Sequence, residues 1–154
     1  MVPPFSLADP RDGHEERDQS KALMALYDRT VDSVTGYATM VEKAEPAFRD
    51  TAERFRALHA RHADSLARLL AEIGAEAEAD GTMMGTVNQA VVTFRAFFDD
   101  IDEDVMDQVR SGEDWVLKAF DDAILEQAGV GAADELRLMR AEVAGLLAET
   151  QHLG

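Results

Sequence analysis

FRDTAERFRALHARHADSLARLLAEI, residues 48–73, is the longest uninterrupted helical pattern in the chain. Its apolar residues recur three or four positions apart, which places them along one face of an α-helix: Phe48, Ala52, Phe55, Leu66, Leu69 and Ile73. His59 or His62 continues that face. Pro46 lies at a first-turn position and Gly74 follows the last apolar residue, and both are typical of helix ends. The pattern predicts one long helix whose buried face needs partner helices from elsewhere in the chain.

Four other stretches carry the same periodicity, so the sequence predicts five helical segments. Their approximate bounds, with the first stretch included, are residues 21–44, 46–73, 82–98, 105–127 and 132–151. The first two are separated by so short a connection that they must fold back antiparallel. Ala, Leu, Glu and Arg dominate the composition and runs of β-branched residues are absent, which favours helix throughout. The predicted fold is an all-α, up-and-down bundle in which four main helices enclose the core.

The length of 154 residues is typical of one domain, and 46% hydrophobic residues are enough for a folded core. Residues 1–19 contain three prolines and alternating charges, which predicts a flexible N-terminal arm. Ser20 is a suitable N-cap for the first helix. We therefore expect an arm at residues 1–19 and one helical-bundle domain at residues 20–154.

The net charge of −16 argues against binding to nucleic acid or to anionic membranes, because phosphate groups are bound by clustered Lys and Arg. The simplest role of this charge is solubility. The chain has no cysteine, which excludes disulfides, zinc–thiolate sites and thiol catalysis. The first residues lack the basic and apolar regions of a signal peptide, and no apolar run approaches the roughly 20 residues of a membrane span. We expect a cytoplasmic protein.

Several polar residues lie on or beside the predicted apolar faces: Tyr27, Thr30, Tyr37, His62, Asn88 and Glu113. Counting residues back from each turn places Thr30, His62 and Glu113 in nearly the same layer of the bundle. In one interpretation, His62 and Glu113 are metal ligands or acid–base groups in the bundle interior. In the other, they are a buried hydrogen-bonded pair that fixes the helix register, which is the simpler interpretation.

Three short patterns are compatible with metal binding. His59 and His62 share a helix face, but a catalytic zinc site needs a third ligand, so structural or surface histidines are the simpler interpretation. Glu149 and His152 form one Glu-x-x-His pair, a motif that di-metal bundles use twice. The acids of residues 99–104 resemble the start of a calcium loop. The Gly and Glu that such a loop requires later are absent, so helix capping explains these acids more simply.

Short motifs characteristic of one protein family are spread between about Leu26 and Ile124: Asp32, Gly36–Tyr37, Arg61, Gly74, Gly81–Thr82, Gly112–Glu113–Asp114 and Lys118–Ala119–Phe120. With these motifs the chain resembles a bacterial ferritin-like four-helix-bundle family of unknown function. Family members often carry His, a basic and an aromatic residue where this chain has Asn88, Gln89 and Ala90. Arg110 and Phe120 replace a usual acid and a usual Tyr. The resemblance implies a bundle related to iron-storage and di-iron proteins, and these departures remove candidate ligands.

These observations favour a non-catalytic bundle that acts by self-association, as a dimer, or by binding a protein partner. Leu26, Leu70 and Val92 lie off the main apolar faces and are candidates for a second contact face. In this case we expect no enzymatic activity and no cofactor.

Two alternatives belong to other functional classes. The first is a metal-binding ferritin-like protein that holds iron or manganese through Glu113, His62 and His59. The second is a carrier of a small ligand, with an internal cavity near Tyr37 and Trp115.

Overall fold

The chain folds into α-helices in a computed structural model that describes residues 10–74 and 105–153. The helices are α1 (Pro10–Lys43), α2 (Pro46–Glu72), α4 (Val105–Glu126) and α5 (Gly131–Thr150), followed by a short 3₁₀ helix, η1 (Gln151–Leu153). Within these ranges there is no β-strand, so the all-α prediction is confirmed. None of the described helices is both long and apolar enough to cross a membrane.

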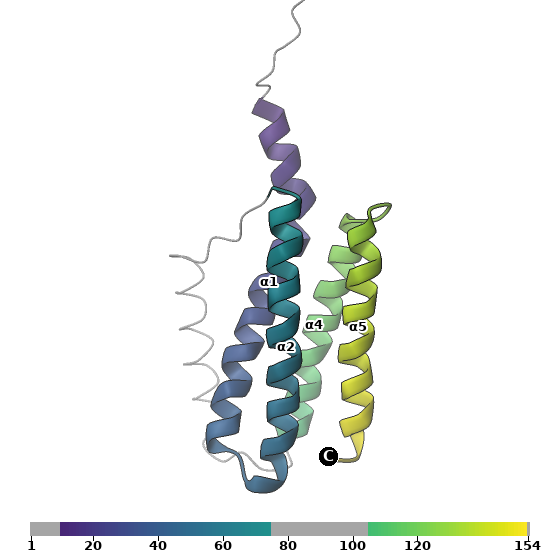
Figure 1. The fold of residues 1–154 in the computed structure, drawn as a ribbon. Helices are drawn as coiled ribbons and strands as arrows, with labels where there is room; N and C mark the ends of the chain where they lie inside the picture. Colours follow the sequence, from purple (N-terminus) through teal and green to yellow (C-terminus); the bar gives the residue numbers. More distant parts are fainter. Residues whose placement is uncertain (1–9, 75–104, 154) are drawn as a thin grey trace, which may run out of the picture.

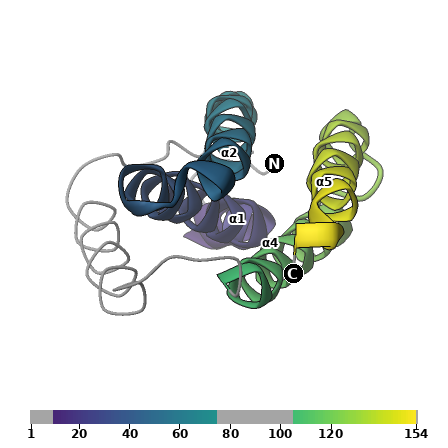
Figure 2. The ribbon, with the colours of Figure 1, turned by 90° about the horizontal axis from the view of Figure 1, so that it is seen from below.

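The four described α-helices stand side by side, and each is antiparallel to its neighbours (Figure 1). α1 and α2 form one hairpin, and α4 and α5 form the other. α1 packs against both α2 and α4 and so joins the two hairpins. α2 and α5 face each other on the remaining side. Among the neighbouring pairs of described helices they touch least, and Figure 2 shows their axes well apart. The widest seam between neighbouring helices therefore lies between α2 and α5.

The core is built from the apolar faces of all four helices. Phe55 of α2 and Phe120 of α4 are its largest fully buried side chains. Leu, Met and Val side chains pack around them: Leu23, Leu26, Met40, Leu66, Leu70, Met106, Val109, Val116, Leu136 and Val143. Removing each such side chain from water contributes about 1.5–3 kcal/mol, which makes this burial the main force that holds the amphipathic helices together.

Helix α2 agrees closely with its predicted bounds, whereas α1 does not. Pro46 lies in the first turn of α2, and Gly74 follows its end with a φ of 82°, a conformation that glycine adopts without strain. α1 begins at Pro10 rather than near Lys21, so the predicted start of this helix is wrong. Ser20, the predicted N-cap, lies inside the helix and is buried. A proline at the first turn, followed by charged residues that tolerate helix, explains the earlier start.

This early start shortens the arm predicted at residues 1–19. Residues 10–19 belong to α1, and residues 1–9 lie outside the part of the chain that the structure describes. The helix predicted at residues 82–98 and the acidic stretch at residues 99–104 also lie outside it. The helix at residues 82–98 therefore stays a prediction.

The second hairpin follows its predicted bounds to within one residue at each end. α4 begins at Val105 and ends at Glu126, and α5 begins at Gly131. Gly129, in the turn between them, has a φ of 87°. This left-handed conformation strains residues that carry a Cβ, so glycine is the residue that permits the tight turn here.

Leu26 and Leu70, the predicted members of a second contact face, are fully buried in the core, so that prediction is wrong for both. α1 contacts helices on two sides, and its buried face is therefore wider than a single seam. Val92, the third member, lies outside the described residues. The large apolar side chains that the structure leaves exposed in the described ranges are Trp115, Leu125, Val130 and Leu138.

Candidate functional site

A buried carboxylate lies inside the bundle. Glu113 projects inward from α4 and is 1% exposed. Its Oε1 accepts a hydrogen bond of 2.6 Å from the hydroxyl of Tyr37 on α1, and it lies 2.7 Å from Nε2 of His59 on α2. Side chains from three helices therefore meet at one oxygen atom, and this contact ties the α1–α2 hairpin to α4.

The structure pairs Glu113 with His59, which corrects the predicted His62–Glu113 pair by one helical turn. An error of three residues along a helix is roughly 5 Å, and counting from turns does not resolve less than that. His62 is buried as well, but its Nε2 lies 3.2 Å from Oε1 of Glu142 on α5. The two histidine rings meet edge-on, with centroids 6.3 Å apart. We call Tyr37, His59, His62 and Glu113 the buried polar cluster.

Aromatic contacts hold the rings of the cluster in place. Tyr37 stacks on Phe55 and on His59, with centroid separations of 5.1 and 5.8 Å. His62 meets Phe120 edge-on at 5.9 Å. Such offset-stacked and edge-on arrangements are the favoured geometries of aromatic pairs. Packing on both sides leaves the two histidine rings little rotational freedom, so their nitrogen atoms keep fixed directions.

Burial controls protonation in the cluster. It raises the pKa of Tyr37 well above the ordinary value of 10.0, and the charge and hydrogen bond of Glu113 raise that pKa further. Tyr37 is therefore a neutral donor near pH 7. Burial also lowers the pKa of His62 below its ordinary value of 6.5, although Glu142 acts in the opposite direction. His62 is thus neutral near pH 7, and its Nε2–H donates to the Glu142 carboxylate.

Three buried atoms of the cluster have no hydrogen-bond partner among the described residues: Oε2 of Glu113, Nδ1 of His59 and Nδ1 of His62. Each histidine uses Nε2 toward a carboxylate. An imidazole ring that donates through Nε2 and is neutral carries its lone pair on Nδ1. Imidazole nitrogens and carboxylate oxygens are common metal ligands. Within residues 10–74 and 105–153, however, no group of three acidic or histidine side chains is arranged to hold an ion. The cluster therefore offers ligand-type atoms that do not converge on one point.

The other polar residues predicted for this layer do not belong to the buried polar cluster. Thr30 is buried, and its hydroxyl donates to the carbonyl of Leu26 at 2.8 Å, within α1. Tyr27 is half-buried against the core. Asn88 lies outside the described residues. Tyr37 is thus the member of the predicted layer that joins Glu113 in the described part of the chain.

Trp115 does not share a cavity with Tyr37, which corrects the expectation of an internal ligand site there. Trp115 is 56% exposed on α4. The charged groups of Arg29 and Lys118 lie 5.7 and 5.3 Å from its ring centre, within cation–π range. Tyr37 is buried among aromatic rings, whereas Trp115 faces solvent between cations.

Three ion pairs bridge α2 and α5. They join Arg54 to Glu149, Arg61 to Glu142 and Arg68 to Glu135. The arginines are seven residues apart on α2, and the glutamates are seven apart in the opposite order on α5, as two antiparallel helices require. We call these three pairs the Arg–Glu ladder. Long side chains connect the two helices here, which explains how α2 and α5 can be neighbours without close backbone contact.

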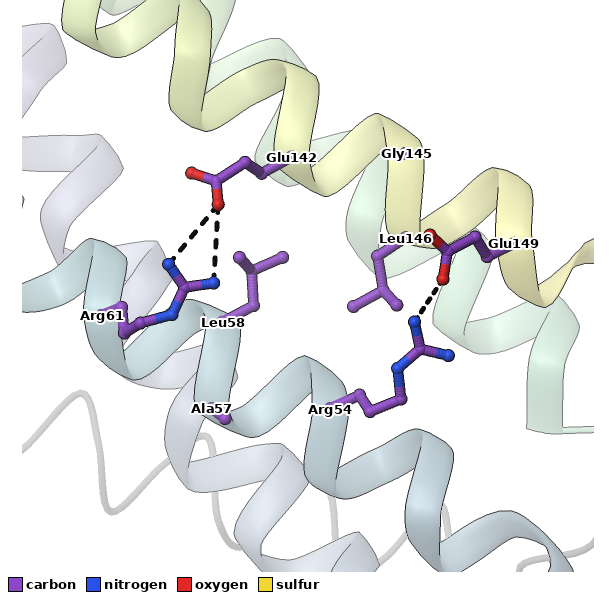
Figure 3. Close-up of a pocket in the computed structure, with 8 residues that line it drawn as sticks. All are labelled: Arg54, Ala57, Leu58, Arg61, Glu142, Gly145, Leu146 and Glu149. Atoms are coloured by element: carbon purple, nitrogen blue, oxygen red, sulfur yellow. Dashed lines mark hydrogen bonds and ion pairs between the residues drawn. The ribbon is translucent and has the colours of Figure 1, made fainter.

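A groove with a volume of about 460 Å³ opens between α2 and α5 (Figure 3). Its lining residues are Arg54, Ala57, Leu58, Arg61, Glu142, Gly145, Leu146 and Glu149. Figure 3 shows Leu58 and Leu146 projecting into the space between two ion pairs of the ladder. A Cβ added to Gly145 would meet no heavy atom within 4 Å, so the groove is open at that position. This α2–α5 groove has an apolar floor between two charged edges.

The Glu-x-x-His pair near the C-terminus does not assemble into a ligand pair among the described residues. Glu149 pairs with Arg54 in the Arg–Glu ladder. His152 is exposed in η1. Glu149 and His152 therefore have different surroundings and do not form a shared site within the described residues.

The sequence prediction missed the ladder and the groove, although a signal for them was present. Arg54, Arg61 and Arg68 lie off the buried face of their helix, and no partners were predicted for them. Glutamates with the same seven-residue spacing occur on α5. Charged residues repeated every seven positions on two helices are typical of interhelical pairing, so matching the two patterns would have paired α2 with α5.

The chain belongs to a family described as a domain of unknown function (DUF2383), which it matches over residues 18–126. No curated protein and no solved structure matches the chain significantly. The family match ends at the last residue of α4, so the buried polar cluster lies inside it and α5 lies beyond it.

Replacing Glu113 by alanine should lower the free energy of unfolding by about 3–5 kcal/mol, because it leaves buried donors without an acceptor. Tyr37→Phe should cost less, and it should cost almost nothing more once Glu113 is already alanine. Urea unfolding of the two single variants and the double variant measures this coupling. Asp114→Ala, an exposed carboxylate on the same helix, is the matched control. Fully additive effects of the two substitutions would contradict the hydrogen bond between them.

The lowered pKa of His62 makes stability depend on pH. The folded protein takes up a proton at His62 less readily than the unfolded chain, so this contribution to stability is complete above pH 6.5. It is lost as the pH falls through the folded-state pKa. The charged and titratable groups that act on His62 are Glu142, which favours protonation, and His59 and Arg61, which oppose it. His62→Gln should therefore flatten the unfolding free energy below pH 6.5, and parallel curves for parent and variant would refute this.

Proposed function

We propose that this chain is a non-catalytic, ferritin-like helical bundle of the cytoplasm that acts by self-association, as a dimer. The observation that carries this proposal is the α2–α5 groove, where the floor of Leu58 and Leu146 faces an open space. Leu58 and Leu146 are themselves nearly buried, so the favourable term is the transfer of an apolar partner side chain from water into the groove above them. A second copy of the chain is always present in the same compartment and at the same concentration.

The buried polar cluster supports a non-catalytic role. A catalytic acid or base must reach a substrate, but Glu113, His59 and Tyr37 are enclosed by the helices that they connect. Glu113 instead receives its hydrogen bonds from two other helices, which is the arrangement of a group that fixes packing. The alternating directions of the four described helices are compatible with an up-and-down, ferritin-like arrangement.

Self-association can be tested on the full chain by sedimentation velocity over a range of protein concentrations. We expect a dimer whose dissociation constant decreases as salt is raised, because two copies with a net charge of −16 repel one another and salt screens this repulsion. Gly145→Leu fills the groove and should weaken association, while Leu138→Ala, an exposed change elsewhere on α5, should not. A monomer at every concentration and salt level would refute self-association.

Metal binding is a second candidate, and one observation favours it. Glu113, His59 and His62 each keep one buried, unpartnered atom of a type that binds iron or manganese. Carboxylates already orient both histidines through Nε2, as they do around many bound metals. An ion bound at one of these atoms would supply its missing partner and would act there as a Lewis acid.

A specific metal must stabilise the folded state by mass action. Thermal unfolding of chelator-treated protein, with and without Fe²⁺, Mn²⁺ or Zn²⁺, measures this effect. We expect an ion that binds the cluster to raise the midpoint of the parent and to leave that of His59→Gln unchanged. Glu149→Gln, remote from the cluster but part of the Glu-x-x-His pair, is the matched control. An unchanged parent midpoint with every ion would remove this candidate.

A further inference from the structure

We infer that residues 1–9 of one copy bind in the α2–α5 groove of a second copy, with Phe5 placed between Leu58 and Leu146. This inference rests on the proposed self-association and names the contact that produces it. We call residues 1–9 the terminal segment.

The groove has the properties of a site for one large apolar side chain. Its volume of about 460 Å³ is in the range of pockets that hold small organic groups. The charges at its edges are already paired, Arg54 with Glu149 and Arg61 with Glu142. Since these pairs neutralise each other, the groove favours a segment with few charges of its own.

The terminal segment, MVPPFSLAD, fits this requirement. It contains one ionisable side chain, Asp9, although the chain as a whole has a net charge of −16. An almost uncharged segment can therefore approach a second copy with little repulsion. Pro3 and Pro4 favour an extended backbone, which reduces the conformational entropy lost on binding. Phe5 follows directly and is the aromatic anchor of the segment.

Chain geometry indicates that the groove belongs to another copy. Leu58 on α2 is level with about Val31 on α1, because the two helices are antiparallel around a two-residue turn. At 1.5 Å per helical residue, Pro10 is therefore about 32 Å from that level. Phe5 lies five residues before Pro10, and five extended residues span at most about 18 Å. Phe5 thus falls far short of its own groove, whereas a second copy can bring its groove to Phe5.

An exchange in which each copy donates its terminal segment to the other gives a closed, two-fold symmetric dimer. Both copies then bury one Phe5 and cover one groove, so no binding surface is left for further chains. This geometry accounts for a dimer rather than an open polymer.

The test uses two full-length variants, Phe5→Ala and Gly145→Leu, compared by sedimentation equilibrium. Each should raise the dimer dissociation constant at least about tenfold, because burying a phenylalanine side chain is worth that much or more. Gly145→Leu should still fold, since its new side chain points into open space and leucine favours helix. Circular dichroism checks this, and Leu138→Ala on α5 is the control that should dimerise like the parent.

Mixing the two variants gives the decisive measurement. Phe5→Ala keeps an intact groove and Gly145→Leu keeps an intact terminal segment, so a mixed pair restores one of the two contacts. We expect the mixture to dimerise more strongly than either variant alone. Because the chain has no cysteine, Ser6→Cys and Ala57→Cys can each carry a single fluorophore, and energy transfer between copies should then appear.

The outcomes separate this inference from the proposed function. If the parent dimerises but both variants dimerise equally well and the mixture gains nothing, the terminal segment is not the contact, although self-association stands. If the parent is monomeric throughout, self-association and the contact both fail. If Gly145→Leu alone weakens the dimer, the groove binds a different part of the second copy and the role of Phe5 is overturned.

Discussion

The structure depends on the burial of one carboxylate. Removing the Glu113 carboxylate from water is costly unless its charge and its lone pairs are matched by donors. Tyr37 and His59 provide donors to Oε1 from two other helices at hydrogen-bond distance, while Oε2 has no partner among the described residues. This requirement restricts α1, α2 and α4 more tightly than apolar packing does, because leucine and valine contacts tolerate small shifts and hydrogen bonds do not. The polar cluster therefore selects one arrangement among the many that the apolar faces permit.

Helix α5 is held to its neighbours by other interactions than those that join α1, α2 and α4. Its apolar face packs in the shared core, but toward α2 it relies on long, exposed ion pairs and on the contact between Glu142 and His62. Exposed ion pairs contribute little to stability, since solvent screens them. The family match also stops where α4 ends. The family match includes α2, α4 and most of α1, and these three helices are joined by the buried polar cluster. α5 lies beyond the family match, and a groove remains between it and α2.

Helical periodicity was sufficient to predict most of this fold. It placed the ends of α2, α4 and α5 within about a residue, because apolar spacing, Pro46 and the glycines agree there. It failed at the start of α1, where a charged, proline-containing stretch looks the same as an arm or as a helix. It identified Glu113 and the two histidines but not the partner of Glu113. His59 and His62 lie on one helix face, and periodicity does not define how far a helix rotates about its axis.

The Arg–Glu ladder has a consequence for specificity. All its cations are on α2 and all its anions on α5, at a regular spacing of seven residues. A slip of α5 by one repeat would still match two of the three pairs, and reversal of α5 would also leave Arg opposite Glu. The ladder thus determines that α2 pairs with α5, but it determines neither the alignment of the two helices nor their relative direction. The tight turn at Gly129 imposes the polarity, and the irregular shapes of Leu136, Met139 and Val143 impose the alignment. Different residues of α5 therefore determine which helix it pairs with and how it is aligned along that helix.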